Sequence, residues 1–314
     1  MADHTRQLLR WMAAHDTPDR VVLLCDDAPL PAVARGTVVV RLPGCLADTG
    51  VGLPAQLLAA GVGAVEAGPC PSRPDEAAAH VAGWRRVLSE RVRPHAAPRR
   101  LRRGRPVVLV LGAVPLPRRV LLGLGMRDAS PLDLDLDDAA RTLVALRLLG
   151  ADTRLAAARP PTTDGDLPTG PEPTSGPAGP GSAAAALAVD GCVACGVCVR
   201  ACPHDALVLE HEGGTSTLRH AREACRSELE CLRLCPAGAF STSGPVPLAD
   251  VLTEPLVTLA EVATAACTRC GARHPSDGGS LCPTCRFREG NAFGSSLPPG
   301  LAARLARERG DVPG

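Results

Sequence analysis

The sequence predicts a parallel α/β domain followed by two small cysteine-rich modules. Short apolar runs alternate with helical patterns in the first half, and 11 of the 14 cysteines fall between positions 192 and 285. The chain has 314 residues, 45% of them apolar, so it is long enough for about two domains with buried cores. Its formal net charge of +1 argues against a protein that coats nucleic acids.

Residues 1–158 are predicted to form the α/β domain. Strands are expected at the β-branched runs Val21–Cys25, Thr37–Leu42, Val62–Val65 and Val107–Leu111. Helices are expected at Leu53–Ala60, Glu76–Ser89 and Asp137–Leu149. Such alternation is typical of a parallel, doubly wound sheet.

The rest of the chain divides by composition. Residues 159–182 are predicted to be a flexible linker, because 12 of these 24 residues are Pro or Gly. Residues 183–245 form a cysteine-rich α+β unit with an internal repeat. Residues 251–312 hold a further module of cysteine pairs and an arginine-rich amphipathic tail, Leu301–Arg309.

The strongest motif is a run of four cysteines that ends in a proline. Cys192, Cys195, Cys198 and Cys202 are separated by two, two and three residues, and Pro203 follows. Such a run lets one loop present three thiolates to the irons of a cubane, while the fourth cysteine points to another cluster. A zinc site is the alternative, but the spacings and the proline together favour an iron–sulfur cluster.

A second, incomplete copy of this run follows. It consists of Cys225, Cys231 and Cys235 with Pro236, and Glu228 stands where the second cysteine would be. Over residues 183–245 the two copies resemble the bacterial two-cluster ferredoxins. We expect strands at 186–189, 207–210, 215–219 and 239–242 and helices at 197–201 and 229–234, in the ferredoxin-like order βαββαβ.

The ferredoxin resemblance implies how the ligands are shared, since the fourth cysteine of each run ligates the other cluster in that family. One [4Fe–4S] cluster would be held by Cys192, Cys195, Cys198 and Cys235. The second would be held by Cys225, Cys231 and Cys202, with Glu228 in the fourth place. Similar ferredoxins with a carboxylate there often carry [3Fe–4S], or a labile [4Fe–4S] with an oxygen ligand. The alternative is that Glu228 is a solvated residue beside a three-iron cluster.

Four later cysteines form a second constellation. Cys267, Cys270, Cys282 and Cys285 make two Cys-x2-Cys pairs separated by 11 residues, an arrangement that suits a closed, tetrahedral zinc site. The segment resembles a zinc ribbon, and a rubredoxin-like iron is the alternative that the short loop disfavours. Such ribbons mostly serve structure or protein docking. Nucleic-acid binding is possible here but is not favoured, since its support is limited to Arg269, Arg273, Arg286 and Arg288, with Phe287 as a candidate for stacking on a base.

Three cysteines of the first domain lie at or just after the ends of predicted strands: Cys25, Cys45 and Cys70. The runs Val38–Cys45 and Leu57–Val65 resemble the small iron–sulfur subunit associated with methyl-viologen-reducing hydrogenase and heterodisulfide reductase. That family binds a [2Fe–2S] cluster with paired cysteines, so the three cysteines are candidates for an additional cluster at the edge of the sheet. The pairs are broken here. We therefore favour buried, apolar thiols in a degenerate docking domain.

An arginine-rich segment, Arg85 to Arg105, contains nine arginines. It is interpreted as a solvated helix and loop in preference to a patch that steers an acidic redox partner.

The chain shows neither a secretory signal in its first 20 residues nor an apolar run long enough to span a membrane. Many cysteines without an export signal favour metal binding in a reducing cytoplasm. No nucleotide-binding, metalloprotease or nucleophile motif accompanies them. The chain is therefore expected to be a non-catalytic carrier or an oxidoreductase subunit, and its being an enzyme is left open.

The expected function is electron transfer. The ferredoxin-like module would relay single electrons through its two clusters between donor and acceptor oxidoreductases, and the N-terminal domain would dock it to one of them. The alternative is a redox-sensing or regulatory protein that acts through its zinc ribbon.

Overall fold

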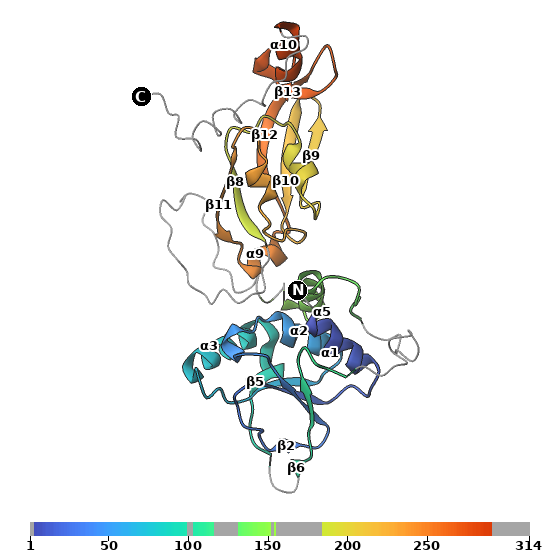
Figure 1. Cartoon of the computed structure of the whole chain (residues 1–314), viewed down its shortest axis with the longest axis vertical. Helices are drawn as coiled ribbons and strands as arrows, with labels where there is room; N and C mark the ends of the chain where they lie inside the picture. Colours follow the sequence, from blue (N-terminus) through green and yellow to red (C-terminus); the bar gives the residue numbers. More distant parts are fainter. Residues whose placement is uncertain (1–2, 99–102, 116–130, 152–153, 155–183, 291–314) are drawn as a thin grey trace. The chain divides into compact units, whose positions relative to one another are not determined.

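The computed structural model describes residues 3–98, 103–115, 131–151, 154 and 184–290 (Figure 1). The chain divides into two compact units, Met1–Ser182 and Ala183–Gly314. The predicted linker 159–182 and the arginine-rich tail Leu301–Arg309 lie outside the described residues. Among the described helices, none has the length and apolar character needed to cross a membrane.

The N-terminal unit is built on a five-stranded parallel sheet. Its strands are β1 (Arg20–Leu24), β3 (Thr37–Arg41), β4 (Ala64–Ala67), β5 (Val92–Pro94) and β7 (Val107–Val110). Their order is β5-β4-β1-β3-β7, and every neighbouring pair is parallel. The central strands β1 and β3 consist almost entirely of buried Val and Leu, as expected for a sheet covered on both faces. The prediction of a parallel sheet is confirmed.

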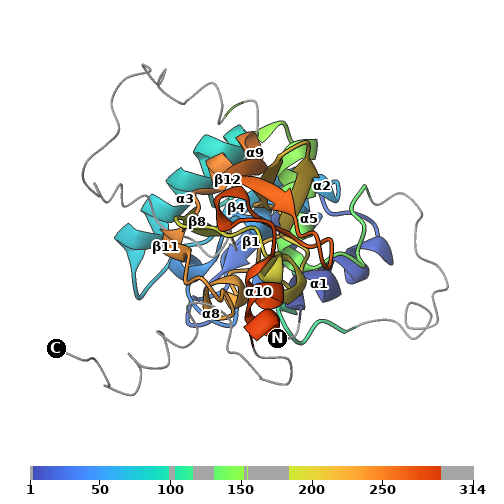
Figure 2. The same cartoon turned by 90° about the horizontal axis from the view of Figure 1, so that it is seen from above.

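Four helices accompany this sheet: α1 (His4–Ala13), α2 (Gly52–Ala59), α3 (Pro74–Leu88) and α5 (Asp138–Leu148). The last three match the predicted helices, whereas α1 lies in a polar stretch that the sequence analysis left unassigned. Seen from above, α2 and α5 lie side by side (Figure 2). Two short strands, β2 (Val33–Ala34) and β6 (Arg103–Gly104), pair antiparallel, away from α2 and α5 in Figure 1. The 3₁₀ turns Leu46–Asp48 and Ser89–Arg91 complete the unit.

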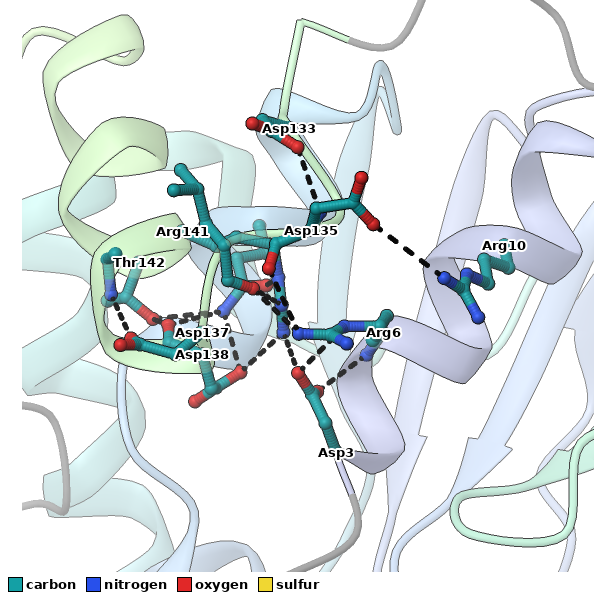
Figure 3. Close-up of polar contacts among 12 residues, drawn as sticks. Asp3, Arg6, Arg10, Asp133, Asp135, Asp137, Asp138, Arg141 and Thr142 are labelled. Atoms are coloured by element: carbon teal, nitrogen blue, oxygen red, sulfur yellow. Dashed lines mark hydrogen bonds and ion pairs between the residues drawn. The ribbon is translucent and has the colours of Figure 1, made fainter.

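A buried polar cluster fastens α1, α2 and α5 together (Figure 3). The side chain of Arg141 on α5 is wholly buried, and its Nη2 lies 2.6 Å from Oδ2 of Asp3, the residue that caps α1. Its Nε donates to Oε1 of Gln56 on α2 at 3.0 Å, and Gln56 Nε2 donates to Oγ1 of Thr142 at 2.9 Å. A buried charge is tolerated only where it is paired and hydrogen-bonded, and this one is both.

The C-terminal unit begins with an arrangement in the order βαββαβ. Its elements are β8 (Ala185–Val189), α7 (Val197–Ala201), β9 (Leu207–Glu212), β10 (Thr215–Ala221), α8 (Glu230–Arg233) and β11 (Phe240–Pro245). The outer strands β8 and β11 pair antiparallel, and β9 and β10 form a hairpin. A small core of Cys198, Leu207, Leu218 and Cys231 lies between these layers.

The hairpin continues into a larger sheet that the sequence analysis did not anticipate. The long strand β12 (Leu256–Ala266) follows α9 (Leu248–Thr253). The first part of β12 pairs antiparallel with the whole of β10, and its end pairs antiparallel with β13 (Arg273–Pro275). The order is β13-β12-β10-β9, and Figure 1 shows β12 running beside β10 toward α10 (Pro283–Gly290). Buried hydroxyls join the strands, with Ser216 Oγ 2.7 Å from Thr264 Oγ1. By strand pairing, β12 therefore belongs to the sheet of the predicted hairpin. A 3₁₀ turn, Ser276–Gly278, follows β13.

Candidate metal centres

The loops of the two cysteine runs have the same backbone shape. Left-handed residues occur at Ala194 and Gly196 in the first run, and at Ser227 and Leu229 in the second, each 33 positions later. The helices repeat as well, because α7 and α8 begin 33 positions apart. A left-handed conformation costs an L-residue roughly 1–2 kcal/mol, so a bulky residue such as Leu229 holds it only where the surroundings impose it. The second run is therefore built on the same template as the first.

Four thiols line one pocket in the first centre. They belong to Cys192, Cys195, Cys198 and Cys235, so the last cysteine of the second run joins the first three of the first run. Leu209, Leu218 and Phe240 supply apolar walls. Peptide N–H groups donate to sulfur at 3.4 Å, from Ala194 to Cys192 and from Ala239 to Cys235.

The pocket fits an iron–sulfur cluster for a physical reason. Burial, and then the nearby Cys195 and Cys192, raise the pKa of the Cys198 thiol to about 12. Thiolates are the form that binds metal, so ionising this group requires a positive charge inside the pocket. Iron supplies such a charge, and the N–H groups stabilise the sulfurs around it.

The second centre offers three thiols, Cys202, Cys225 and Cys231. Burial, and then the charges of Cys225 and Cys202, raise the pKa of Cys231 to about 11. The peptide N–H of Ala206 donates to the sulfur of Cys202 at 3.4 Å, as Ala239 does to Cys235 in the first centre. The three thiols therefore fit three corners of a cluster.

Glu228 occupies the place of Cys195 in the repeated loop, but its carboxylate is engaged elsewhere. Its Oε1 lies 3.1 Å from Nε2 of His204, and its side chain is 52% exposed. His204 was not among the predicted site residues, because no spacing rule relates it to Glu228, and the matching position of the other run holds Ala237.

The third centre brings together Cys267, Cys270, Cys282 and Cys285, whose sulfurs all lie within 4.8 Å of one another. Gly271 adopts a φ of +74° and donates its N–H to the carbonyl of Cys267 at 2.9 Å, which closes the first cysteine turn. The N–H of Thr268 donates to the carbonyl of Ser280 at 3.0 Å and holds the two turns together.

Backbone N–H groups, that of Cys282 first, lower the pKa of the Cys267 thiol to about 6. This thiol is therefore ready to bind a cation near neutral pH. Four thiols this close fit one tetrahedral ion, since zinc–sulfur bonds of about 2.3 Å separate two sulfurs by about 3.8 Å.

The three cysteines of the N-terminal unit also come together. The sulfurs of Cys25, Cys45 and Cys70 lie within 4.8 Å of one another at the carboxyl edge of the parallel sheet. The convergence of the strand ends was expected, whereas so close an approach of the sulfurs was not.

Part of the arginine-rich segment is used for internal ion pairs. Arg85 lies 2.7 Å from Glu90, and Arg93 lies 2.8 Å from the buried carboxylate of Glu66. Arg99, Arg100 and Arg102 lie outside the described residues.

The βαββαβ arrangement and its thiol-lined pocket define an iron–sulfur module, and comparisons with known proteins agree. Residues 191–239 match the family model of the 4Fe-4S dicluster domain. A ferredoxin from Pyrobaculum islandicum is 40% identical over 52 residues, which are 17% of this chain and 46% of that protein. The chain thus spans about half the length of that curated relative. The C-terminal unit contains a ferredoxin-type 4Fe–4S module.

Proposed function

We propose that this protein transfers electrons, relaying them one at a time through two ferredoxin-type clusters between a donor and an acceptor oxidoreductase. The observation that carries the proposal is the pocket shared by Cys192, Cys195, Cys198 and Cys235. It joins the two runs into one crosswise ligand set, which is the arrangement of two-cluster ferredoxins. The repeated loop around Cys225 supports a second cluster, held by Cys202, Cys225 and Cys231 with Glu228 beside them.

The residues of the chain tune the clusters, which supply one-electron chemistry when bound. Apolar side chains such as Leu209 and Phe240 keep water from the first pocket, and peptide N–H groups donate to the cysteine sulfurs. Burial and such hydrogen bonds set the reduction potential of a cluster. The second centre has the carboxylate of Glu228 where the first has the thiol of Cys195, so its cluster would differ from the first in stability and in potential.

In this proposal the zinc ribbon and the N-terminal domain attach the cluster module to other proteins. Cys267, Cys270, Cys282 and Cys285 would hold a structural zinc ion that fixes the ribbon, which offers a surface for a protein partner. The N-terminal α/β domain would dock the module to an oxidoreductase.

One observation favours a second candidate, a redox-sensing protein. The strand β12 joins the sheet of the cluster module directly to the ribbon, so loss of a labile cluster beside Glu228 has a structural route to the ribbon surface. In this alternative the ribbon binds its target only in one oxidation state.

Anaerobic purification with iron analysis, electron paramagnetic resonance and a reductase assay tests the proposal. We expect about seven or eight irons per chain, and Cys198→Ser should remove about four of them. Cys285→Ser in the ribbon is the matched control and should leave the iron content unchanged. A flavoprotein reductase should reduce the clusters, and the reduced protein should pass electrons to an acceptor. Clusters that load but exchange no electrons, with target binding that depends on oxidation, would favour the sensor.

A further inference from the structure

The three thiols of the N-terminal unit are placed by the topology of the sheet. β1 lies between β3 and β4, and all three strands run parallel. Cys25 directly follows β1, Cys45 comes a few residues after β3, and Cys70 a few residues after β4. Their sulfurs meet within 4.8 Å, with those of Cys45 and Cys70 only 3.4 Å apart.

These separations suit one ion better than a cluster. Two sulfurs on the same zinc lie about 3.8 Å apart, given tetrahedral bonds of about 2.3 Å. A [2Fe–2S] cluster needs two ligands on each of two irons, whereas this group offers three thiols and, among the described residues, no fourth Cys, His, Asp or Glu atom within the same distance. In the first ferredoxin pocket, by contrast, the described thiols do not form so tight a group.

Each sulfur accepts a hydrogen bond from the backbone. The N–H of Leu46 donates to Cys25 at 3.2 Å, that of Ala47 to Cys45 at 3.4 Å, and that of Arg73 to Cys70 at 3.3 Å. Three donors aimed at three sulfurs stabilise negative charge, so the loops after the strands are shaped for thiolates.

Three thiolates held this close together repel one another. A bound cation would offset that repulsion, because an opposite charge within a few ångströms favours the ionised form of each sulfur.

The surrounding charges favour a divalent ion. Three thiolates carry three negative charges. A divalent ion neutralises two of them, and the guanidinium of Arg73 balances the third. The guanidinium of Arg73 lies against Cys45 and is held there by Asp48 at 2.5 Å. Arg41 holds the backbone of Cys25, since its Nη1 donates to the carbonyl of that residue at 3.1 Å.

We infer that Cys25, Cys45 and Cys70 bind a single zinc ion with three thiolates and leave its fourth position to an external ligand. Cys25 and Cys70 are buried, whereas Cys45 is half-buried, so the open position faces the Cys45 side. Three protein ligands with one exchangeable position is the coordination of reactive zinc, in contrast to the closed set of four in the ribbon.

Metal analysis of the full chain tests the inference. In protein purified without oxygen, we expect two zinc ions per chain, one of them in the ribbon. The double variant Cys282→Ser/Cys285→Ser should keep one zinc, and X-ray absorption at the zinc edge should show three sulfur neighbours and one lighter atom. Further substitution with Cys70→Ser should remove this zinc and leave iron unchanged.

Ser72→Ala is the matched control, because it alters the same loop without touching a sulfur, and it should retain the zinc. The ribbon double variant keeps Cys25, Cys45 and Cys70, so its spectrum does not depend on whether a variant of these three cysteines folds. Zinc that disappears entirely with the ribbon cysteines would overturn the inference. So would iron that is lost with Cys70→Ser, or a Cys45–Cys70 disulfide in place of a metal in the anaerobic protein.

Discussion

The guanidinium of Arg141 lies 2.6 Å from the carboxylate of Asp3, although 138 positions separate the two residues. The pair ties α5 to Asp3, the N-cap residue of α1, so the start of this helix is fastened to the buried side of α5. Because Arg141 is fully buried, the pair matters to stability in a way that surface pairs do not.

Removal of Asp3 should destabilise the N-terminal unit strongly. Asp3→Ala leaves a buried guanidinium short of its closest anion, which costs about 3 kcal/mol in the free energy of unfolding. Trp11 and Trp84, the two tryptophans of the chain, both lie in this unit, so tryptophan fluorescence in denaturant reports its unfolding. Arg10→Ala is the control, because Arg10 meets the exposed Asp135 only at 4.0 Å, and its loss should cost less than about 0.5 kcal/mol. Equal effects of the two substitutions would contradict the prediction.

Gly68 should resist substitution because the backbone after β4 passes close to β1. A Cβ at this position would lie 2.7 Å from Leu24 Cδ1 and 3.2 Å from the carbonyl oxygen of Leu23. Gly68→Ala should therefore push the two strands apart and destabilise the unit by about 1–3 kcal/mol in the same fluorescence assay. Gly44→Ala is the matched control, because a Cβ added there would have no described atom within 4 Å apart from those of its own residue and its two chain neighbours. An unchanged Gly68→Ala protein would show that this close approach does not limit the sheet.

Glu228 should make the second cluster the first to lose iron in air. A carboxylate is a harder ligand than a thiolate, and this one lies 3.1 Å from His204. The air-exposed protein should show an oxidised three-iron signal in electron paramagnetic resonance. Glu228→Cys should abolish that signal, because it places a fourth thiol on a loop that already has the shape of the first run.

Two further variants separate ligation from loop shape. His204→Ala should leave the three-iron signal in place but change how readily added ferrous iron rebuilds the fourth corner, since the carboxylate is then freed. Glu228→Gln is the isosteric control and should keep the three-iron signal. Wild-type protein that retains two intact four-iron clusters in air would make Glu228, or another residue, a firm ligand.

His220 should make the C-terminal unit less stable in mild acid. Burial, and then the charge of Arg222, lower its pKa to about 4 from 6.5, and its Nε2 has no hydrogen-bond partner among the described residues. The unfolded chain therefore takes up a proton below pH about 6.5 that the folded chain refuses until about pH 4, so stability falls as the pH drops through this range.

At pH 5.5 the loss from His220 should be about 1 kcal/mol relative to pH 7.5. Bleaching of the visible cluster absorbance in denaturant measures it, because tryptophan reports only the other unit. His220→Leu should have a shallower pH dependence than the wild type, and this comparison removes any acid sensitivity of the clusters themselves. Parallel curves for the two proteins would show that His220 is not responsible.

The sequence predicted those strands and helices whose own residues form a clear apolar pattern. Strands β1 and β3 are runs of Val and Leu that only a sheet covered on both faces can bury, so their alternation with helices predicted the parallel sheet. Strand β5 was missed because Val92 is its only buried residue, so the strand has no apolar run. Its neighbour Arg93 pairs with Glu66, which is distant in the sequence, and no local pattern predicts that contact. Helix α1 was missed because its apolar residues Leu8, Leu9 and Met12 are set among charges.

The same division holds for the metal centres. Cysteine spacing is local, and it predicted which thiols belong to which loop; the assignment of ligands to each cluster remains a prediction. The contact of His204 with Glu228 joins the two runs across 24 positions, and no spacing rule encodes it. The pairing of β12 with β10 is also non-local, so the sequence suggested a separate ribbon where the structure has a shared sheet.

The shared strand makes the C-terminal unit a rigid spacer. Leu256 of β12 pairs with Ala221, four residues before Cys225, and Ala266 at the other end directly precedes Cys267. Eleven residues of extended chain cover about 36 Å. The side chain of Arg273 bonds the carbonyl of Gly213 at the hairpin tip, so the ribbon is braced at the end of the strand opposite Cys225. A protein docked on the ribbon, as proposed, would lie at the far end of β12 from Cys225, and the proposed second cluster would remain accessible to another protein at the same time.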